Sequence, residues 1–156
     1  MKLLTKLLKY DIILYKYEFE YTMFLINKQV DYAVQFLLTL AALPTEESLS
    51  LRIFSQNRSI SFLFLQKIAR SLKSAGFIDA SKGSRGGYFL KVNPEQITLK
   101  NVVEALEGKY SAVACMKDVH DCPVTQICLS KNVLYQVQSD ILRVLETHTL
   151  SSMSKI

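Results

Sequence analysis

Apolar side chains recur at three- and four-residue intervals from Lys28 to Leu43, which is the spacing of one face of an α-helix. Pro44 ends this pattern, because proline cannot donate the backbone hydrogen bond that a continuing helix needs. The side chains expected to face a core are Val30, Ala33, Val34, Leu37, Leu38, Leu40 and Ala41. The pattern therefore predicts a first helix over residues 28–43.

A shorter helical pattern follows at residues 49–56. Its inward side chains are expected to be Leu49, Ile53 and Phe54. Residues 57–59 are polar and indicate a turn. This stretch therefore predicts a short second helix that is followed at once by a third.

The third helix is predicted over residues 62–75. Ser61 is expected to cap its start, because a serine hydroxyl accepts from free backbone N–H groups of a first turn. Gly76 stands where a helix-ending glycine belongs. The side chains expected to be buried are Leu65, Ile68, Ala69 and Leu72. Two short helices joined by a tight turn form a helix-turn-helix pattern.

A β-hairpin is predicted directly after this pattern. Residues 77–81 and 87–90 indicate two strands. The basic turn between them and the first residue of the second strand together hold three of the five glycines in the protein. A hairpin in this place is the wing of a winged helix. The predicted fold class is therefore mainly α with a small β-hairpin wing, a winged helix-turn-helix followed by a long C-terminal helix.

The C-terminal part begins with Thr98, which is expected to cap a helix over residues 99–106 that ends at Gly108. A long final helix is predicted over residues 129–147. Its apolar side chains are Val133, Leu134, Val137, Ile141, Leu142, Val144 and Leu145. This stripe is too wide for a solvated helix, so we interpret the element as a dimerisation helix. Packing against the first helix of the same chain is the alternative.

The distribution of charge indicates the kind of partner. Nineteen basic and fourteen acidic residues give a formal net charge of +5. Between Arg52 and Lys91 eight residues are basic and only Asp79 is acidic, so this segment alone carries +7. Such one-sided charge is typical of a module that binds the phosphate backbone of nucleic acid.

We therefore expect double-stranded DNA to be bound by the second half of the helix-turn-helix and by the wing. Gln66 and Lys67 lie near the start of the third helix, where side chains reach base edges. The residues expected to meet phosphates are Arg58, Ser59, Ser61, Arg70 and Lys73. Lys82 and Arg85 on the wing are expected to enter a minor groove.

All three cysteines fall within fourteen residues, at Cys115, Cys122 and Cys128. Clustered thiolates are ligands for soft metals such as iron, zinc or copper(I), and such sites commonly take four protein ligands. A structural zinc with His120 as the fourth ligand is one alternative, and free thiols without metal are another. An odd number of closely spaced cysteines favours a reducing cytoplasm over a disulfide scaffold.

The domain organisation follows from these elements. We expect an N-terminal extension at 1–22, a winged helix-turn-helix DNA-binding domain at 23–92, a linker helix with the cysteine segment at 93–128, and a dimerisation helix with a tail at 129–156. The extension is expected to be dispensable; an amphipathic helix that binds a membrane or a partner is the alternative. Charged residues interrupt every apolar run before it reaches the roughly 18 residues of a membrane span, so no membrane partner is expected.

Patterns of catalytic residues are missing from the sequence. It has no Ser/His/Asp or Cys/His arrangement with a third orienting group, no paired carboxylates and no phosphate-binding loop. An enzyme or an electron carrier is therefore not expected.

From Asn27 onward the chain resembles the IscR/NsrR (Rrf-type) family of bacterial winged-helix transcription regulators. The resemblance lies in residues 31–34 of the first helix, in the spacing of Ser61, Phe64, Leu65, Lys67, Ile68 and Leu72, in residues 75–78, in the wing at 82–90, in the three cysteines, and in residues 147–150. It implies a homodimer, for instance a repressor, that binds operator DNA through the third helix and the wing. It also implies that an iron–sulfur cluster sets the DNA affinity.

The chain departs from this family at the fourth ligand of the cluster. Some relatives place a histidine three residues after the last cysteine, where this chain has Lys131, whose ammonium cannot bind a metal. Other relatives use an aspartate near the start of the first helix, supplied by the partner subunit, and Asp31 stands at that position. The first gap between cysteines is also one residue longer than in the commonest forms, so a 2Fe–2S and a 4Fe–4S cluster both remain candidates.

Overall fold

Helix α2 (Lys28–Ala41) is the central element of a computed structural model that describes residues 26–44, 47–83, 86–113, 116 and 124–154. The side-chain oxygen of Asn27 caps α2 by accepting from the backbone N–H groups of Gln29 and Val30, both at 3.0 Å. The helix ends three residues before Pro44, close to the predicted end. Its buried residues are Val30, Ala33, Phe36, Leu37 and Leu40.

Helices α3 (Leu51–Arg58) and α4 (Phe62–Ser74) form the predicted helix-turn-helix. The turn is shorter than expected, because residues 57 and 58 belong to α3 and Ser59 alone adopts the left-handed conformation, at φ 53°. The hydroxyl of Ser55 donates to the carbonyl oxygen of Ile60 at 2.6 Å and closes the turn. The prediction that Ile53 points inward was wrong, since 53% of this residue is exposed while Leu51 and Phe54 are buried.

The end of α4 is fixed by Gly76, as predicted, at φ 80°. The N–H of Gly76 donates to Lys73 O at 3.0 Å, and the N–H of Phe77 donates to Leu72 O at 3.1 Å. These two bonds form a Schellman motif, in which a glycine at positive φ lets the chain reverse direction. The chain therefore leaves α4 directly into the hairpin.

The hairpin pairs β1 (Ile78–Ala80) with β2 (Tyr88–Leu90) in an antiparallel register that places Ile78 opposite Leu90. On its other side β2 pairs with Leu49, since the N–H groups of Leu49 and Tyr88 each donate to the carbonyl of the other residue at 2.9 Å. Gly87 permits this approach, because a Cβ there would lie 2.6 Å from the backbone of Leu49. The backbone before α3 therefore anchors the base of the wing.

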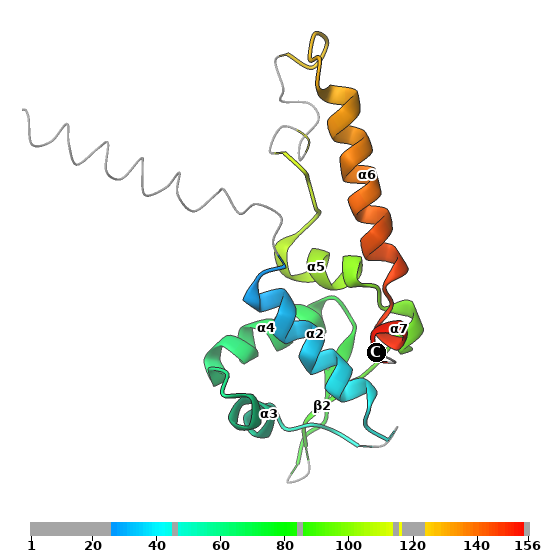
Figure 1. The fold of residues 1–156 in the computed structure, drawn as a ribbon. Helices are drawn as coiled ribbons and strands as arrows, with labels where there is room; N and C mark the ends of the chain where they lie inside the picture. Colours follow the sequence, from blue (N-terminus) through cyan, green and yellow to red (C-terminus); the bar gives the residue numbers. More distant parts are fainter. Residues whose placement is uncertain (1–25, 45–46, 84–85, 114–115, 117–123, 155–156) are drawn as a thin grey trace, which may run out of the picture.

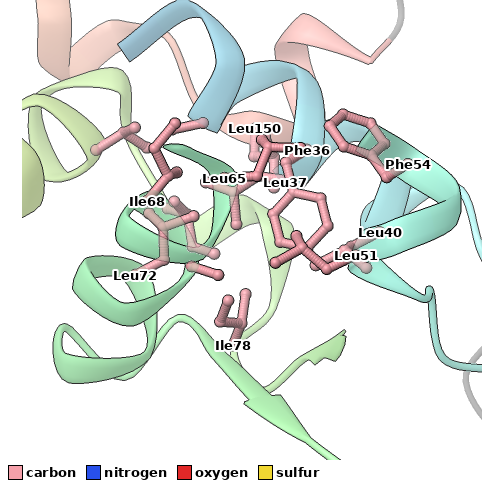
Figure 2. Close-up of a cluster of buried hydrophobic side chains, with 14 of the residues drawn as sticks. Phe36, Leu37, Leu40, Leu51, Phe54, Leu65, Ile68, Leu72, Ile78 and Leu150 are labelled. Atoms are coloured by element: carbon pink, nitrogen blue, oxygen red, sulfur yellow. The ribbon is translucent and has the colours of Figure 1, made fainter. Parts of the chain in front are cut away.

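Residues from distant parts of the sequence share one core, as Figure 2 shows. Its members come from α2, α3, α4 and β1, together with Ile60, Ile97, Val102 and Leu150. Leu150 belongs to a short helix, α7 (Leu150–Met153), that the sequence did not predict. Two backbone bonds hold this helix in place: the N–H of Leu150 donates to Ile97 O and that of Leu99 to His148 O, both at 2.8 Å. The C-terminal tail thus completes the core of the winged helix.

Two further helices lead from the wing to this tail. After a 3-10 turn, η1 (Pro94–Gln96), helix α5 (Leu99–Glu107) starts with a capping box between Thr98 and Asn101. Helix α6 (Lys131–Thr147) projects from the body formed by the other elements, while the hairpin lies at the opposite end (Figure 1). Lys100 and Glu146 join α5 to the base of α6 through an ion pair at 2.5 Å.

The described residues confirm the predicted fold class, which is mainly α with a two-stranded wing and a long C-terminal helix. Within the same residues no helix is both long and apolar enough to cross a membrane. The proposed extension at 1–22 lies outside them.

Candidate nucleic-acid interface and cysteine segment

Helix α4 has two chemically different faces. Leu65, Ile68, Ala69 and Leu72 are buried, as predicted. Gln66, Lys67 and Arg70 are exposed on the other side of the helix, where three- and four-residue spacing puts them on one stripe. The structure thus brings together three of the residues that the sequence assigned to DNA.

At the turn before α4, Arg58, Ser59 and Ser61 lie beside this stripe in sequence and are exposed as well, whereas Ile60 is buried. Ser61 occupies the N-cap position, but its side chain makes no capping hydrogen bond, so the predicted cap is present in position only. Arg58 lies with its guanidinium 6.0 Å from the centre of the Phe54 ring. The guanidinium of Arg52, which belongs to the basic segment but was not among the residues predicted to contact DNA, lies 5.0 Å from the centre of the Phe62 ring. These cation–π contacts hold two positive charges near the start of α4.

Lys73 is engaged differently from the other candidate residues. Its ammonium lies 2.7 Å from the carboxylate of Asp79, with both side chains about half exposed. The hydrogen bond to Asp79 raises the pKa of Lys73, and the same bond lowers the pKa of Asp79. The lysine charge is therefore already matched by the one acidic residue of the basic segment, which sequence spacing did not reveal.

The wing presents its own cation. Lys82 is exposed at the end of the hairpin, whereas Arg85 lies outside the described residues. The hairpin is held beyond its strands by the N–H of Ser81, which donates to Gly87 O at 2.9 Å, and by the N–H of Gly86, which donates to Gly83 O at 3.0 Å. These hydrogen bonds hold the backbone next to Lys82 in place, at the end of the body opposite α6 (Figure 1).

Of the proposed metal ligands in the cysteine segment, Cys128 is described, whereas Cys115, Cys122 and His120 lie outside the described residues. Cys128 Sγ lies 3.5 Å from the hydroxyl of Ser130. The hydrogen bond from this hydroxyl is the main cause that lowers the pKa of the Cys128 thiol, and the charge of Lys131 adds to it. A lower pKa favours the thiolate, which is the form that binds a metal.

The chain just before the three cysteines also contacts α6. The backbone N–H of Ala112 donates to the side-chain oxygen of Gln138 at 2.9 Å. Cys128 itself lies three residues before α6 begins, at the end of this helix that points away from the body (Figure 1). Both ends of the cysteine segment therefore lie along one helix.

Asp31 lies in the first turn of α2, within the body of the molecule. It is exposed, and its two carboxylate oxygens accept from the side-chain amide of Gln35, both at 3.1 Å. Helix α6 has 17 residues and is therefore about 25 Å long. Figure 1 shows α2 in the body and the start of α6, next to Cys128, at the end that points away from it, so α2 and the chain around Cys128 lie in different parts of the molecule.

The donor set fits a soft metal or an iron–sulfur cluster, because three thiols are available within one short segment. Among the described residues no group of three metal-ligating side chains comes together. A site built on these thiols would need Cys115 and Cys122 together with Cys128.

Comparison with known proteins gives consistent matches at the level of sequence. The model of the Rrf2 family, described as an iron-dependent transcriptional regulator, matches residues 26–156. Protein rrf2 of Nitratidesulfovibrio vulgaris is 32% identical over 124 residues, which cover 80% of this chain and 83% of that protein. The HTH-type transcriptional regulator NsrR of Halalkalibacterium halodurans is 31% identical over 129 residues, which cover 82% of this chain and 88% of that protein.

The chain is also similar to solved structures of transcription regulators. CymR, the global cysteine regulator of B. subtilis, superposes with a TM-score of 0.70 at 25% identity, over 85% of this chain and 98% of that one. IscR of T. potens superposes with a TM-score of 0.66 at 26% identity, over 84% of this chain and 86% of that one.

Proposed function

Because the chain belongs to the Rrf2 family of transcriptional regulators, we propose that it is a homodimer that binds operator DNA and whose cysteine segment sets the DNA affinity. Its relatives are regulators of transcription and not enzymes, in agreement with the absence of a catalytic pattern in the sequence. The proposal places the protein in the cytoplasm, where DNA is present and thiols stay reduced.

The observation that carries the proposal is the exposed stripe of α4. Gln66 and Lys67 extend from the first half of a helix whose opposite face is fixed in the core. A glutamine can pair with an adenine and a lysine with a guanine in the major groove. Rigid packing of α4 supports this role, since base recognition needs side chains held in one register.

Phosphate contacts would surround this stripe. Arg58, Ser59, Ser61 and Arg70 are exposed around α4, and Lys82 is exposed on the wing. We assign Arg58, Ser59, Ser61 and Arg70 to the phosphate backbone, and Lys82 with Arg85 to an adjacent minor groove. Lys73 can contact a phosphate only when DNA displaces the carboxylate of Asp79 from the Lys73 ammonium.

Dimerisation through α6 is supported by the apolar side chains that this helix leaves in water. Val133, Val137 and Val144 are exposed to 65%, 44% and 55%, and of the whole helix only Leu145 is buried. Helix α6 projects from the body, so a second copy can approach the part of it that lies beyond α5 (Figure 1). Burial of the same stripe on both copies gives a twofold dimer, which matches a palindromic operator.

We propose an iron–sulfur cluster, 2Fe–2S or 4Fe–4S, as the group that the cysteine segment holds. Cys115, Cys122 and Cys128 would bind it as thiolates, and Asp31 of the partner subunit is our candidate for the fourth ligand. The separation of Asp31 from Cys128 within one chain supports a ligand from the partner. When bound, such a cluster supplies a centre that responds to iron, oxidants or nitric oxide. An oxygen ligand is a weaker partner for iron than a thiolate, which suits a sensor.

The link from this segment to DNA would pass through α6. Gln138 holds the start of the segment, and Cys128 lies just before the helix begins. Binding of a cluster by the three thiolates would therefore change how two α6 helices pack, and with them the spacing of the two α4 helices. A regulator with free thiols and one with a zinc held with His120 are the alternatives that metal analysis distinguishes.

The DNA part is tested by selection of binding sites from random duplex DNA with the full-length protein, followed by titration against salt. We expect one palindromic sequence to be enriched. Its association constant should fall steeply with salt, by a log–log slope of about −0.9 for each phosphate contacted. Failure to enrich any sequence, or binding that ignores salt, would contradict the proposed role of α4 and the wing.

A further inference from the structure

Leu63 lies in the first turn of α4, and 76% of this residue is exposed to solvent. It is the most exposed of the large hydrophobic residues described between 26 and 113, which also include Ile26 and Ile53. A lone exposed leucine is common on protein surfaces, so its meaning depends on what surrounds it. The surroundings of Leu63 are polar and cationic.

The neighbours of Leu63 in sequence explain why this side chain is not needed for packing. The ring of Phe62 lies under the guanidinium of Arg52, at 5.0 Å. The ring of Phe64 makes an edge contact with Tyr32, with 6.0 Å between ring centres. Both aromatic rings are partly buried against the core, whereas Leu63 between them points into solvent.

Helical spacing places Leu63 on the stripe that carries the candidate base contacts. Gln66 and Lys67 follow it by three and four residues, and Arg70 follows by seven. Leu63 is therefore one turn closer to the start of the helix than Gln66. Residues in this part of a recognition helix are those that contact base edges in the major groove.

The charge of this stripe indicates what kind of molecule Leu63 contacts. Lys67 and Arg70 would be desolvated by a hydrophobic protein surface, whereas a polyanion matches them. The major groove of DNA presents one apolar group to such a helix, the C5 methyl of thymine. A side chain that is apolar and surrounded by cations fits this methyl group.

We propose that Leu63 is a specificity residue that selects thymine by packing against its C5 methyl, beside the base contacted by Gln66. This inference rests on the proposed DNA contact of α4 and adds a residue to it. Loss of one buried methyl group corresponds to about a fourfold change in affinity. The operator should therefore contain a thymine, in each half-site, at which cytosine or uracil is disfavoured.

The test uses the full-length protein and the operator obtained by selection, with each thymine replaced in turn by deoxyuridine. This replacement removes the methyl group and keeps the base pairing. The wild type should lose about fourfold in affinity at one thymine of each half-site. Leu63→Ala should bind the two operators equally, and circular dichroism should show an unchanged fold because the side chain is exposed.

Ile53→Ala is the matched control, since it shortens another exposed aliphatic side chain, on α3. It should lose affinity at the same deoxyuridine position as the wild type. A wild type that ignores every deoxyuridine, or an equal loss in Leu63→Ala, would overturn the inference while leaving the DNA contact of α4 in place. Failure of the wild type to select any sequence would overturn both.

Discussion

The ammonium of Lys73 lies 2.7 Å from the carboxylate of Asp79 and so joins the last turn of α4 to the first strand of the wing. Both residues belong to the segment that is expected to face DNA. While the ion pair is formed, the charge of Lys73 is not available to a phosphate, and the pair links the wing to α4.

Replacement of Asp79 by Asn should release this charge. Lys73 would then be free to contact a phosphate, so the log–log salt slope of operator binding should steepen by about one per subunit. Affinity at low salt should rise, and Lys73→Gln combined with Asp79→Asn should remove the gain. An unchanged slope in Asp79→Asn would show that Lys73 does not reach the DNA.

The same ion pair has a defined pH dependence. Asp79 has a lowered pKa, so its contribution to stability is present above its ordinary value of 3.8 and is lost as the pH falls through the lowered value. Lys73 has a raised pKa, so its contribution is present below 10.5 and is lost as the pH rises through the raised value. Thermal unfolding of the wild type and Asp79→Asn should differ near neutral pH and converge in strong acid. A difference that persists below the lowered pKa would contradict this assignment.

The base of the wing depends on Gly87. A Cβ at this position would lie 2.6 Å from the backbone of Leu49, so Gly87→Ala must break the pairing of Leu49 with Tyr88. We expect a loss of about 1–3 kcal/mol in unfolding free energy, measured with a chemical denaturant. Lys82→Ala, on the exposed end of the same hairpin, is the control and should leave stability unchanged. Equal stability of the two variants would exclude a structural role for this close approach.

The dimer should depend on the exposed stripe of α6. Val137→Glu places a charge in this stripe, and the variant should run as a folded monomer in light scattering and lose operator affinity. Ser139→Glu adds the same charge on the other side of the helix, where residue 139 is exposed, and should remain dimeric. A dimeric Val137→Glu protein would place the interface elsewhere.

The fourth ligand is tested by Asp31→Asn. The variant keeps the size of the side chain but removes the carboxylate, so iron should be lost faster from the anaerobic protein while the fold is retained. Gln35→Ala removes the amide that donates to Asp31 and keeps the carboxylate itself, so it should retain iron. Equal iron retention in the wild type and both variants would remove Asp31 from the ligand set.

The sequence predicted most of the helix-turn-helix because its signals are periodic and local. The buried stripe of α4 and the glycine at its end follow from spacing and from the conformation that Gly76 adopts. Ile53 was placed wrongly because α3 has only eight residues, and two turns of helix do not distinguish one inward face from its neighbour.

Contacts between distant residues could not be predicted in the same way. The packing of Leu150 into the core depends on where α6 ends, and the pairing of Lys73 with Asp79 depends on the Schellman turn between them. The spacing of the buried residues leaves Leu63 off the core face of α4, but it does not show that this side chain is free of every other contact. Its 76% exposure in the folded chain does.

The central claim, that a cluster in the cysteine segment sets DNA affinity, is tested most directly on anaerobically purified protein. Iron, sulfide, the absorption spectrum and operator affinity should be measured on the same samples before and after treatment with a chelator. We predict a brown protein with iron and sulfide bound together, loss of the colour in Cys122→Ala, and an operator affinity that changes at least about tenfold when the cluster is removed. A colourless protein without iron, zinc as the sole bound metal, or an affinity that is the same with and without the cluster would contradict the claim.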